Sequence, residues 1–163
     1  EAMRISRSSF YAAFGDKRSL FKEVLSLFSE RTREMLIDAR EEVGAVDSMR
    51  RFFYVTLLDV PRYRSRRGCL MVNTILELAE VDPELSEMAA RELGQIEALF
   101  ESYFREAQSS SQYPENREAR DLAAQVMLLN QGIRVASRKP ISRTELKKQI
   151  DTAVSFLGLP ASV

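Results

Sequence analysis

The chain has 163 residues, 45% of them hydrophobic, and its 24 basic and 24 acidic side chains give a formal net charge of zero. This composition is typical of a globular protein and excludes a chain that binds polyanions along its whole length. No apolar run approaches the roughly 18 residues that a transmembrane helix needs, so no membrane partner is expected. The single cysteine excludes an internal disulfide and fits a cytoplasmic protein.

A short helix followed by a glycine turn is predicted over residues 6–15, which read SRSSFYAAFG. Ser6 is placed to cap the helix, because its hydroxyl can accept a free backbone N–H of the first turn. Phe10 and Phe14 share one face at i, i+4 spacing, and Gly15 is placed to end the helix. An ordinary helical hairpin packed by these two phenylalanines is one interpretation of the segment.

The charges that follow this helix favour a different interpretation. Lys17 and Arg18 lie in the first turn of a second helix, where cations oppose the macrodipole, so an external anion would explain them. Five basic residues against two acidic ones give positions 1–22 a local charge of +3. Small residues such as Ser8 and Ala12 on the outer face would let the first helix approach another surface closely. These features are typical of a recognition helix in a DNA major groove.

The run ISRSSFYAAFGDKRSLF at 5–21 resembles the second half of the helix-turn-helix domain of the TetR/AcrR family of transcriptional repressors. The matching features are Ile5-Ser6, Phe10-Tyr11, Phe14, Gly15, Lys17 and Leu20-Phe21. One departure is Ala13, which stands where many members carry a histidine that contacts phosphate. The resemblance implies that 1–28 is a helix-turn-helix domain lacking its first helix and that 29–160 is a regulatory body.

The resemblance also assigns roles within this DNA-binding head. It implies that Arg7, Ser8, Ser9 and Ala12 face base edges, whereas phosphate contacts position the helix without reading sequence. The partner is then double-stranded operator DNA. The predicted DNA-binding residues are Arg4, Ser6, Arg7, Ser8, Ser9, Tyr11, Ala12 and Lys17.

Apolar residues recur at helical spacing along the rest of the chain, so an all-α fold is predicted. Gly44 and Pro61 are expected to end two of the helices, and Asp82 is placed to cap another. The nearly continuous apolar run at 69–81 is compatible with a strand, although its length and composition favour a buried helix. The helices are expected near 17–43, 48–60, 69–81, 83–108, 118–138 and 142–157.

Aromatic and methionine side chains recur among these helices, and most would form the core. A second interpretation is that some of them line an apolar cavity between helices, in which polar neighbours orient a ligand. The resemblance implies a small-molecule effector. The predicted ligand-binding residues are Phe53, Leu57, Met71, Asn73, Thr74, Glu77, Phe100, Tyr103, Phe104, Met127 and Gln131.

The last two predicted helices carry narrow apolar seams suited to helix–helix packing. The resemblance implies that these helices of two subunits form a four-helix interface, so that the protein is a homodimer and its operator is nearly palindromic. The predicted interface residues are Leu122, Val126, Leu129, Ile133, Leu146, Ile150, Val154 and Leu157.

Residues with recognisable catalytic or metal chemistry are scarce. The chain has no histidine, no nucleophile elbow and no nucleotide loop, so neither an enzyme nor a cofactor or metal site is expected. Cys69 is interpreted as a core thiol, with an electrophile sensor as the alternative because Arg66 and Arg67 are close in sequence. The basic segment 62–68 is interpreted as a solvated connector, with a second nucleic-acid contact as the alternative.

Together these features predict a ligand-responsive DNA-binding transcriptional regulator. The prediction is a repressor that binds a palindromic operator as a dimer and is released by a small apolar or amphipathic effector. A helical dimeric protein-interaction module without DNA binding is the alternative, because a neutral chain with packing seams would also suit it. An enzyme that uses Glu77 in an internal cavity is a third class, which the lack of acid–base partners disfavours.

Overall fold

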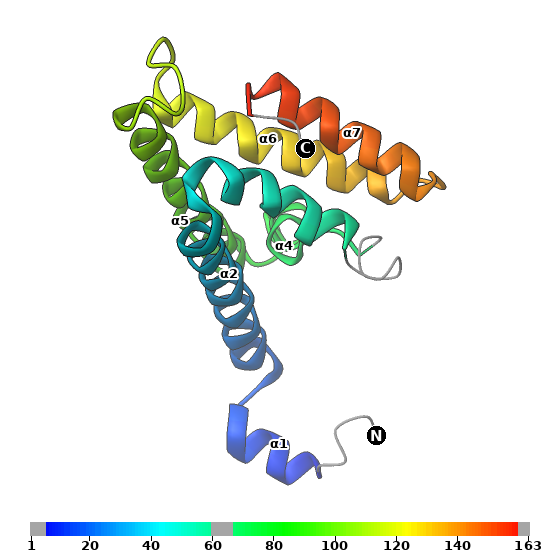
Figure 1. The fold of residues 1–163 in the computed structure, drawn as a ribbon. Coiled ribbons are helices and arrows are strands. Elements are labelled where there is room, and N and C mark those ends of the chain that lie inside the picture. The colour runs from blue at the N-terminus through cyan, green and yellow to red at the C-terminus, as the bar shows by residue number, and fades with distance from the viewer. Residues whose placement is uncertain (1–5, 60–66, 160–163) are drawn as a thin grey trace.

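A computed structural model describes residues 6–59 and 67–159, together with their side chains except those of Arg7 and Phe10. Every regular element within these ranges is helical, which confirms the predicted all-α fold (Figure 1). None of the helices found there is long and apolar enough to cross a membrane. The elements are α1 (Arg7–Phe14), α2 (Lys17–Phe53), the π-helical turn η1 (Tyr54–Leu58), α4 (Leu70–Leu78), α5 (Pro83–Ser109), α6 (Ala119–Ser137) and α7 (Arg143–Phe156).

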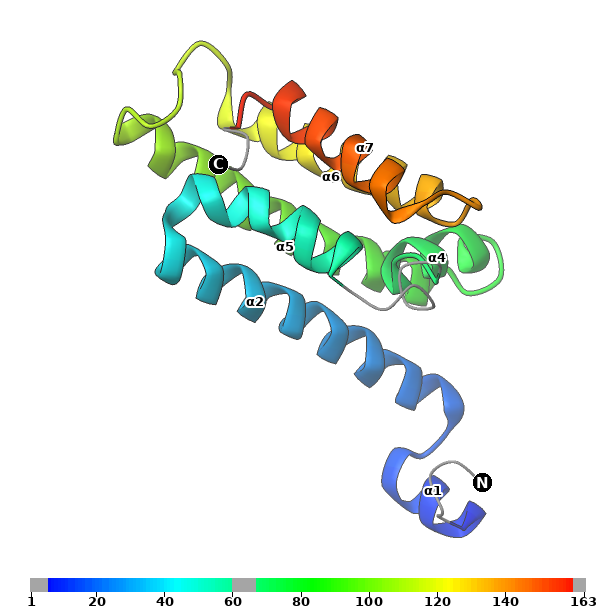
Figure 2. The ribbon, with the colours of Figure 1, turned by 45° about the vertical axis from the view of Figure 1, so that its right-hand side comes forward.

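The longest element, α2, changes direction at Gly44. This glycine has φ 80° and ψ 171°, a backbone conformation that interrupts the helix and that other residues rarely adopt. The segment 17–43 therefore ends there, as the sequence predicts, and the segment from Ala45 to Phe53 runs back alongside it (Figure 2).

Helix α5 packs against α2 along most of its length, and the two run in the same direction (Figure 2). Ion pairs mark both ends of this contact. Arg18 pairs with Asp82 near the start of the two helices, and Arg40 pairs with Glu106 at 2.9 Å near their ends. The two long helices can be parallel because the segment from Ala45 onward brings the chain back toward the start of α5 before α5 begins.

Aromatic side chains from α2 and α5 meet at the centre of the core. Phe52 packs edge-to-face on Phe53 and on Phe100, with ring centroids 5.7 Å and 5.0 Å apart. Such pairs contribute about 0.5–1.5 kcal/mol each beyond the burial of their area. They fix the returning segment of α2 against α5.

Helices α6 and α7 form the end of the molecule opposite α1 (Figure 1). The loop from 110 to 118 joins α5 to α6 and is held at both sides. The buried Tyr113 packs on Phe104 with ring centroids 5.2 Å apart and donates its hydroxyl proton to the Leu157 carbonyl. The Gln108 amide donates to the Arg117 carbonyl at 2.7 Å. These contacts tie the end of α5 to the end of α7.

Replacing Gly44 by alanine tests the reversal in α2. Gly44→Ala is expected to lower the free energy of unfolding by about 1–3 kcal/mol, because alanine is strained at φ 80° even though the space around a Cβ is open. Gly94, which lies within α5 and is also surrounded by open space, is the matched control. Gly94→Ala is expected to raise the same quantity by about 0.5–1 kcal/mol. Urea titrations at one protein concentration measure both, and equal effects would contradict the account.

Candidate nucleic-acid interface and ligand cleft

Helix α1 stands at the end of α2, away from α6 and α7 (Figure 1). The Ser6 hydroxyl caps it by accepting the Ser9 N–H at 3.0 Å. Gly15 ends it with φ 72°, and the Asp16 carboxylate caps α2 by accepting the Ser19 N–H at 2.7 Å. These three interactions set the angle between α1 and α2. The sequence predicts that Ser6 caps α1 and that Gly15 ends it, but it does not identify Ser19 as the donor to Asp16.

The predicted DNA-contacting side chains that the structure describes are all exposed. Ser8, Ser9 and Ala12 lie on α1, and the Tyr11 ring is 50% exposed. Lys17 follows in the first turn of α2 and is also exposed. Arg4 and the side chain of Arg7 lie outside the described part of the chain. The structure thus presents a small, polar helix with a tyrosine and a lysine beside it.

Arg18 is also exposed, but its guanidinium is paired with acidic side chains of the body. Its Nε and one Nη contact the two carboxylate oxygens of Asp82 at 2.7 Å and 2.9 Å, and the same Nη lies 2.6 Å from Glu84. Lys22 also pairs with Glu84. We call these four residues the Arg18 clamp. The external anion expected for both first-turn cations therefore remains an expectation for Lys17 alone.

The acidic half of the clamp sits at the start of α5, where carboxylates also stabilise the helix dipole. Asp82 caps α5 by accepting the Leu85 N–H at 3.2 Å, so the capping role expected from the sequence is confirmed. Its hydrogen bond from Arg18 is the main reason that the pKa of this carboxyl is about 2. Hydrogen bonds from Lys22 and then Arg18 lower the pKa of Glu84 as well.

Most predicted ligand-binding residues are buried in the core of the described part of the chain. Aromatic and aliphatic side chains fill one another's space there, and Thr74 donates its hydroxyl proton to the Leu70 carbonyl at 2.9 Å. Glu77 is exposed, whereas Asn73 and Gln131 line a small separate cavity. A ligand site at the buried residues stays a prediction. The core members are Phe53, Leu57, Met71, Thr74, Phe100, Tyr103, Phe104 and Met127.

A larger hollow lies between the two segments of α2. It has a volume of about 350 Å³, which is within the range of small-molecule sites. Charged residues rim it, including Asp38 and the ion pair between Arg51 and Glu42 at 2.5 Å. We call it the α2 cleft. Its floor is apolar and is formed by Met35, Leu36, Ala39, Phe52 and Val55.

Sequence reasoning missed the α2 cleft because its two walls lie on opposite sides of Gly44. Met35 and Phe52 face the same space only because the chain reverses between them. Helical periodicity places both residues on apolar faces, but it does not say which faces meet. The sequence feature that could have indicated the cleft is a glycine between two amphipathic segments, since it allows the chain to reverse and the two apolar faces to meet.

The residues predicted to form the dimer interface are already covered within one chain. Leu122, Val126 and Ile150 are fully buried, so the seam of α6 packs on the protomer's own helices. This placement corrects the expected interface. Half-buried Leu129 and buried Ile133, Leu146, Val154 and Leu157 complete the set. The exposed apolar residues of α6 and α7 are Leu128, Val135 and Phe156, which are 67%, 60% and 68% exposed.

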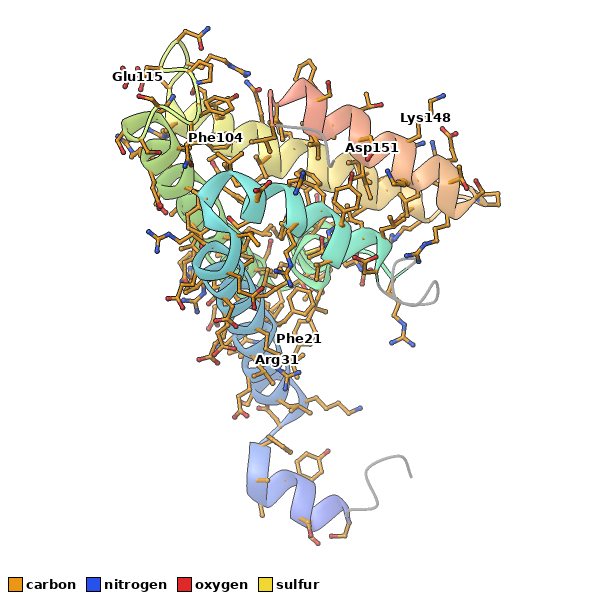
Figure 3. The ribbon with its side chains drawn as sticks, in the orientation of Figure 1. Phe21, Arg31, Phe104, Glu115, Lys148 and Asp151 are labelled. Atoms are coloured by element: carbon orange, nitrogen blue, oxygen red, sulfur yellow. The ribbon has the colours of Figure 1, made fainter. Side chains whose placement is uncertain are left out.

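The far side of α7 is held to η1. The Tyr54 hydroxyl donates to the Asp151 carboxylate, and Lys147 pairs with the same carboxylate at 2.8 Å. Figure 3 labels Asp151 on α7. Hydrogen bonds from Lys147 and then Tyr54 lower the pKa of Asp151. No cluster of residues able to hold a metal ion occurs in the described ranges.

Comparisons with known proteins agree with this architecture. Residues 45–154 match the family described as Tetracyclin repressor-like, C-terminal domain. The uncharacterized HTH-type transcriptional regulator YezE of Bacillus subtilis (strain 168) is 26% identical over 157 residues, covering 94% of this chain and 80% of YezE. A TetR-family regulator from Rhodococcus sp. shares the fold with a TM-score of 0.72 at 16% identity, covering 94% of this chain and 81% of that one.

A cysteine mutant of the TetR-family regulator CifR, complexed with 26-bp double-strand operator DNA, is a further solved relative. It has a TM-score of 0.72 and 25% identity to this chain, covering 94% of this chain and 81% of that one. A helical body that carries a short exposed helix on a long connecting helix is the architecture of a helix-turn-helix transcriptional regulator. Because the family match spans more than half of its residues, the chain belongs to the TetR family.

The pKa of Asp82 predicts how the Arg18 clamp responds to acid. Its carboxyl titrates at about 2 in the folded protein against 3.8 ordinarily, so the clamp stabilises the folded state above pH 4. That stability is lost as the pH falls through the folded value, because the carboxyl then becomes protonated. Asp82→Asn should therefore unfold more readily than the parent at pH 7, and the difference should vanish near pH 2. Urea titrations across this range test it, and a difference independent of pH would contradict it.

Proposed function

We propose that this TetR-family member is a repressor that binds a nearly palindromic operator as a homodimer and is released by a small apolar or amphipathic effector. The exposed head formed by α1 and the start of α2 is the observation that carries the proposal. Ser8, Ser9 and Ala12 have side chains short enough for α1 to approach base edges closely. Lys17 supplies a charge for the phosphates that position the helix.

The proposed dimer uses the exposed faces of α6 and α7. Leu128 and Val135 lie seven residues apart on α6, so both fall on one side of that helix. Phe156 adds an exposed ring from α7. Apolar side chains of this size on neighbouring helices are typical of an interface core. A two-part operator requires such an interface to place both heads on the same side of the dimer, with the recognition helices about 34 Å or a multiple of that distance apart.

The proposed effector site is the α2 cleft. Its walls run from Arg31 to Glu42 and from Ser48 to Val55, away from the head, while the Arg18 clamp holds the head end of α2 to α5. A molecule that wedges the two segments of α2 apart would change how α2 lies on α5. It releases DNA only if it binds the non-DNA geometry more tightly, since equal affinity for both geometries shifts nothing.

The relatives support a regulator over the other two classes. CifR is seen with operator DNA, and YezE is described as an HTH-type regulator. A protein-interaction module would have no use for a small, polar helix set apart from the body. An enzyme is disfavoured because Glu77 is exposed and does not line the α2 cleft.

Removing the Lys17 charge should weaken DNA binding similarly for all sequences. Lys17→Ala is expected to lower the slope of log affinity against log salt by about one per protomer, because one phosphate contact is lost. Lys148→Ala is the matched control, since Lys148 is exposed on α7 at the opposite end of the molecule (Figure 3). Fluorescence anisotropy at several salt concentrations measures both slopes. An unchanged slope for Lys17→Ala would rule out the phosphate role.

Filling the α2 cleft should block the binding of apolar molecules there. The neutral dye N-phenyl-1-naphthylamine serves as the probe, and its fluorescence rises when it enters an apolar site. Val55→Trp is expected to abolish this rise while DNA affinity stays at the parent value, because Val55 lines the cleft far from α1. Val24→Trp, at a site 40% exposed on α2, is the control and should bind the dye normally. Dye binding that survives Val55→Trp would place the apolar site elsewhere.

A further inference from the structure

Two stretches of the chain carry several arginines and no acidic residue. Neither 60–76 nor 122–144 contains an aspartate or a glutamate. The structure brings parts of both stretches together where α4 begins beside the end of α6. One Nη of Arg138 on α6 donates to the Arg67 carbonyl at 2.7 Å and to the Asn73 amide oxygen at 2.9 Å. Positive charge therefore collects here without the carboxylates that neutralise it elsewhere, as in the Arg18 clamp.

Arg134 is the residue of this region whose charge is least compensated. Its Nε donates to the Asn130 amide oxygen at 3.2 Å, and its two terminal nitrogens have no hydrogen-bond or ion-pair partner within the described ranges. Burial lowers the pKa of its guanidinium. The side chain is half-buried, so its cation is partly desolvated, and desolvating a charge without an anionic partner is costly. Its terminal nitrogens are therefore available to an anion bound beside α4 and α6.

A small cavity lies against these side chains. Its volume is about 30 Å³, enough for a group of a few atoms, since one water needs roughly 10–15 Å³ on the same measure. Arg134, Arg138 and Gln131 line it from α6, and Cys69 and Asn73 line it from the start of α4. No side chain caps α4, so its first-turn N–H groups add a favourable end of the helix dipole. The donors around this cavity match a carboxylate, which arginine binds in a two-pronged geometry.

The surroundings of the cavity are apolar and exposed. Leu76 on α4 and Val135 on α6 line it and are 74% and 60% exposed. An anion held at Arg134 would therefore leave an attached hydrocarbon chain lying across Leu76 of α4, because Val135 belongs to the face of α6 that the proposed dimer uses. The α2 cleft differs in charge, because the acidic residues Glu34, Asp38 and Glu42 stand on its rim beside Arg31 and Arg51, whereas the cavity between α4 and α6 is lined by arginines without acids.

We propose that the cavity between α4 and α6 is a binding site for an amphipathic carboxylate, with Arg134 and Arg138 holding the carboxylate and Leu76 contacting the apolar tail. The site is separate from the α2 cleft and does not depend on DNA binding. It lies at the start of α4, whose far end leads to Asp82 of the Arg18 clamp. Occupancy would order the junction of α4 and α6.

The test uses octanoate as the probe and Cys69 as the reporter. Cys69 is the one cysteine of the chain, lines the cavity and is only 5% exposed, so its reaction rate with the uncharged reagent N-ethylmaleimide reports on occupancy. Octanoate is expected to slow this reaction severalfold and to raise the melting temperature at fixed protein concentration. Octan-1-ol and octyltrimethylammonium should do neither at the same concentration, because they lack the carboxylate.

Variants separate this site from general binding. Arg134→Gln should raise the octanoate concentration for half protection by about tenfold or more, since a charged hydrogen-bond donor is lost. Arg138→Gln should weaken protection in the same direction and serves as the second variant if Arg134→Gln does not fold. Arg120→Gln, which removes the same charge from an exposed position on α6, should leave protection unchanged. Val55→Trp should also leave it unchanged, because that variant fills only the α2 cleft.

Three results would overturn the proposal. One is equal protection by octan-1-ol, which would make the site merely apolar. Another is protection by inorganic phosphate at the octanoate concentration, which would remove the role of the tail. The last is an unchanged midpoint in folded Arg134→Gln or Arg138→Gln. None of these measurements uses DNA, so they stand apart from any failure of operator binding.

Discussion

The parallel packing of α2 on α5 is the constraint on which the other features depend. Helix α2 carries the head at one end and reverses at Gly44 at the other, so any change in its position on α5 moves both. The Arg18 clamp and the pair between Arg40 and Glu106 hold the two ends of this contact, while the cluster around Phe52 and Phe100 fixes the returning segment. Exposed ion pairs contribute little stability individually, so this arrangement can be shifted by a ligand of ordinary affinity.

The distribution of charge separates the tasks of the molecule although its net charge is zero. Lys17 beside a small polar helix suits phosphates, the rim of the α2 cleft is mainly acidic, and the junction of α4 and α6 holds arginines without acids. Each region would select a different chemical class of partner. A chain of zero net charge can therefore carry three surface regions of different local charge, and these regions form only when the helices pack together.

Local patterns predicted the helices well and the sites less well. Caps and breakers such as Ser6, Gly15 and Gly44 act within a few residues, so their effects can be worked out from the sequence. Periodicity placed Phe53 and Phe100 on apolar faces, and both are buried, but it does not say whether the opposing side chains leave a cavity between them. Arg18 gave no local signal of its partner Asp82, which lies 64 positions away in the chain. For the same reason, the apolar face of α6 with Leu122 and Val126 was assigned to a subunit interface, whereas these two side chains are buried within one chain.

The most direct test of the account is whether the head reads DNA sequence. Fluorescence anisotropy would compare DNA from upstream of the protein's own gene with a scrambled version of the same length, at two salt concentrations. The account predicts tight binding to the upstream DNA, much weaker binding to the scrambled one, and a steep loss of affinity with salt. Equal affinity of a folded protein for the two DNAs would contradict the claim that α1 recognises the sequence of the upstream DNA. The helical body would then be the functional part.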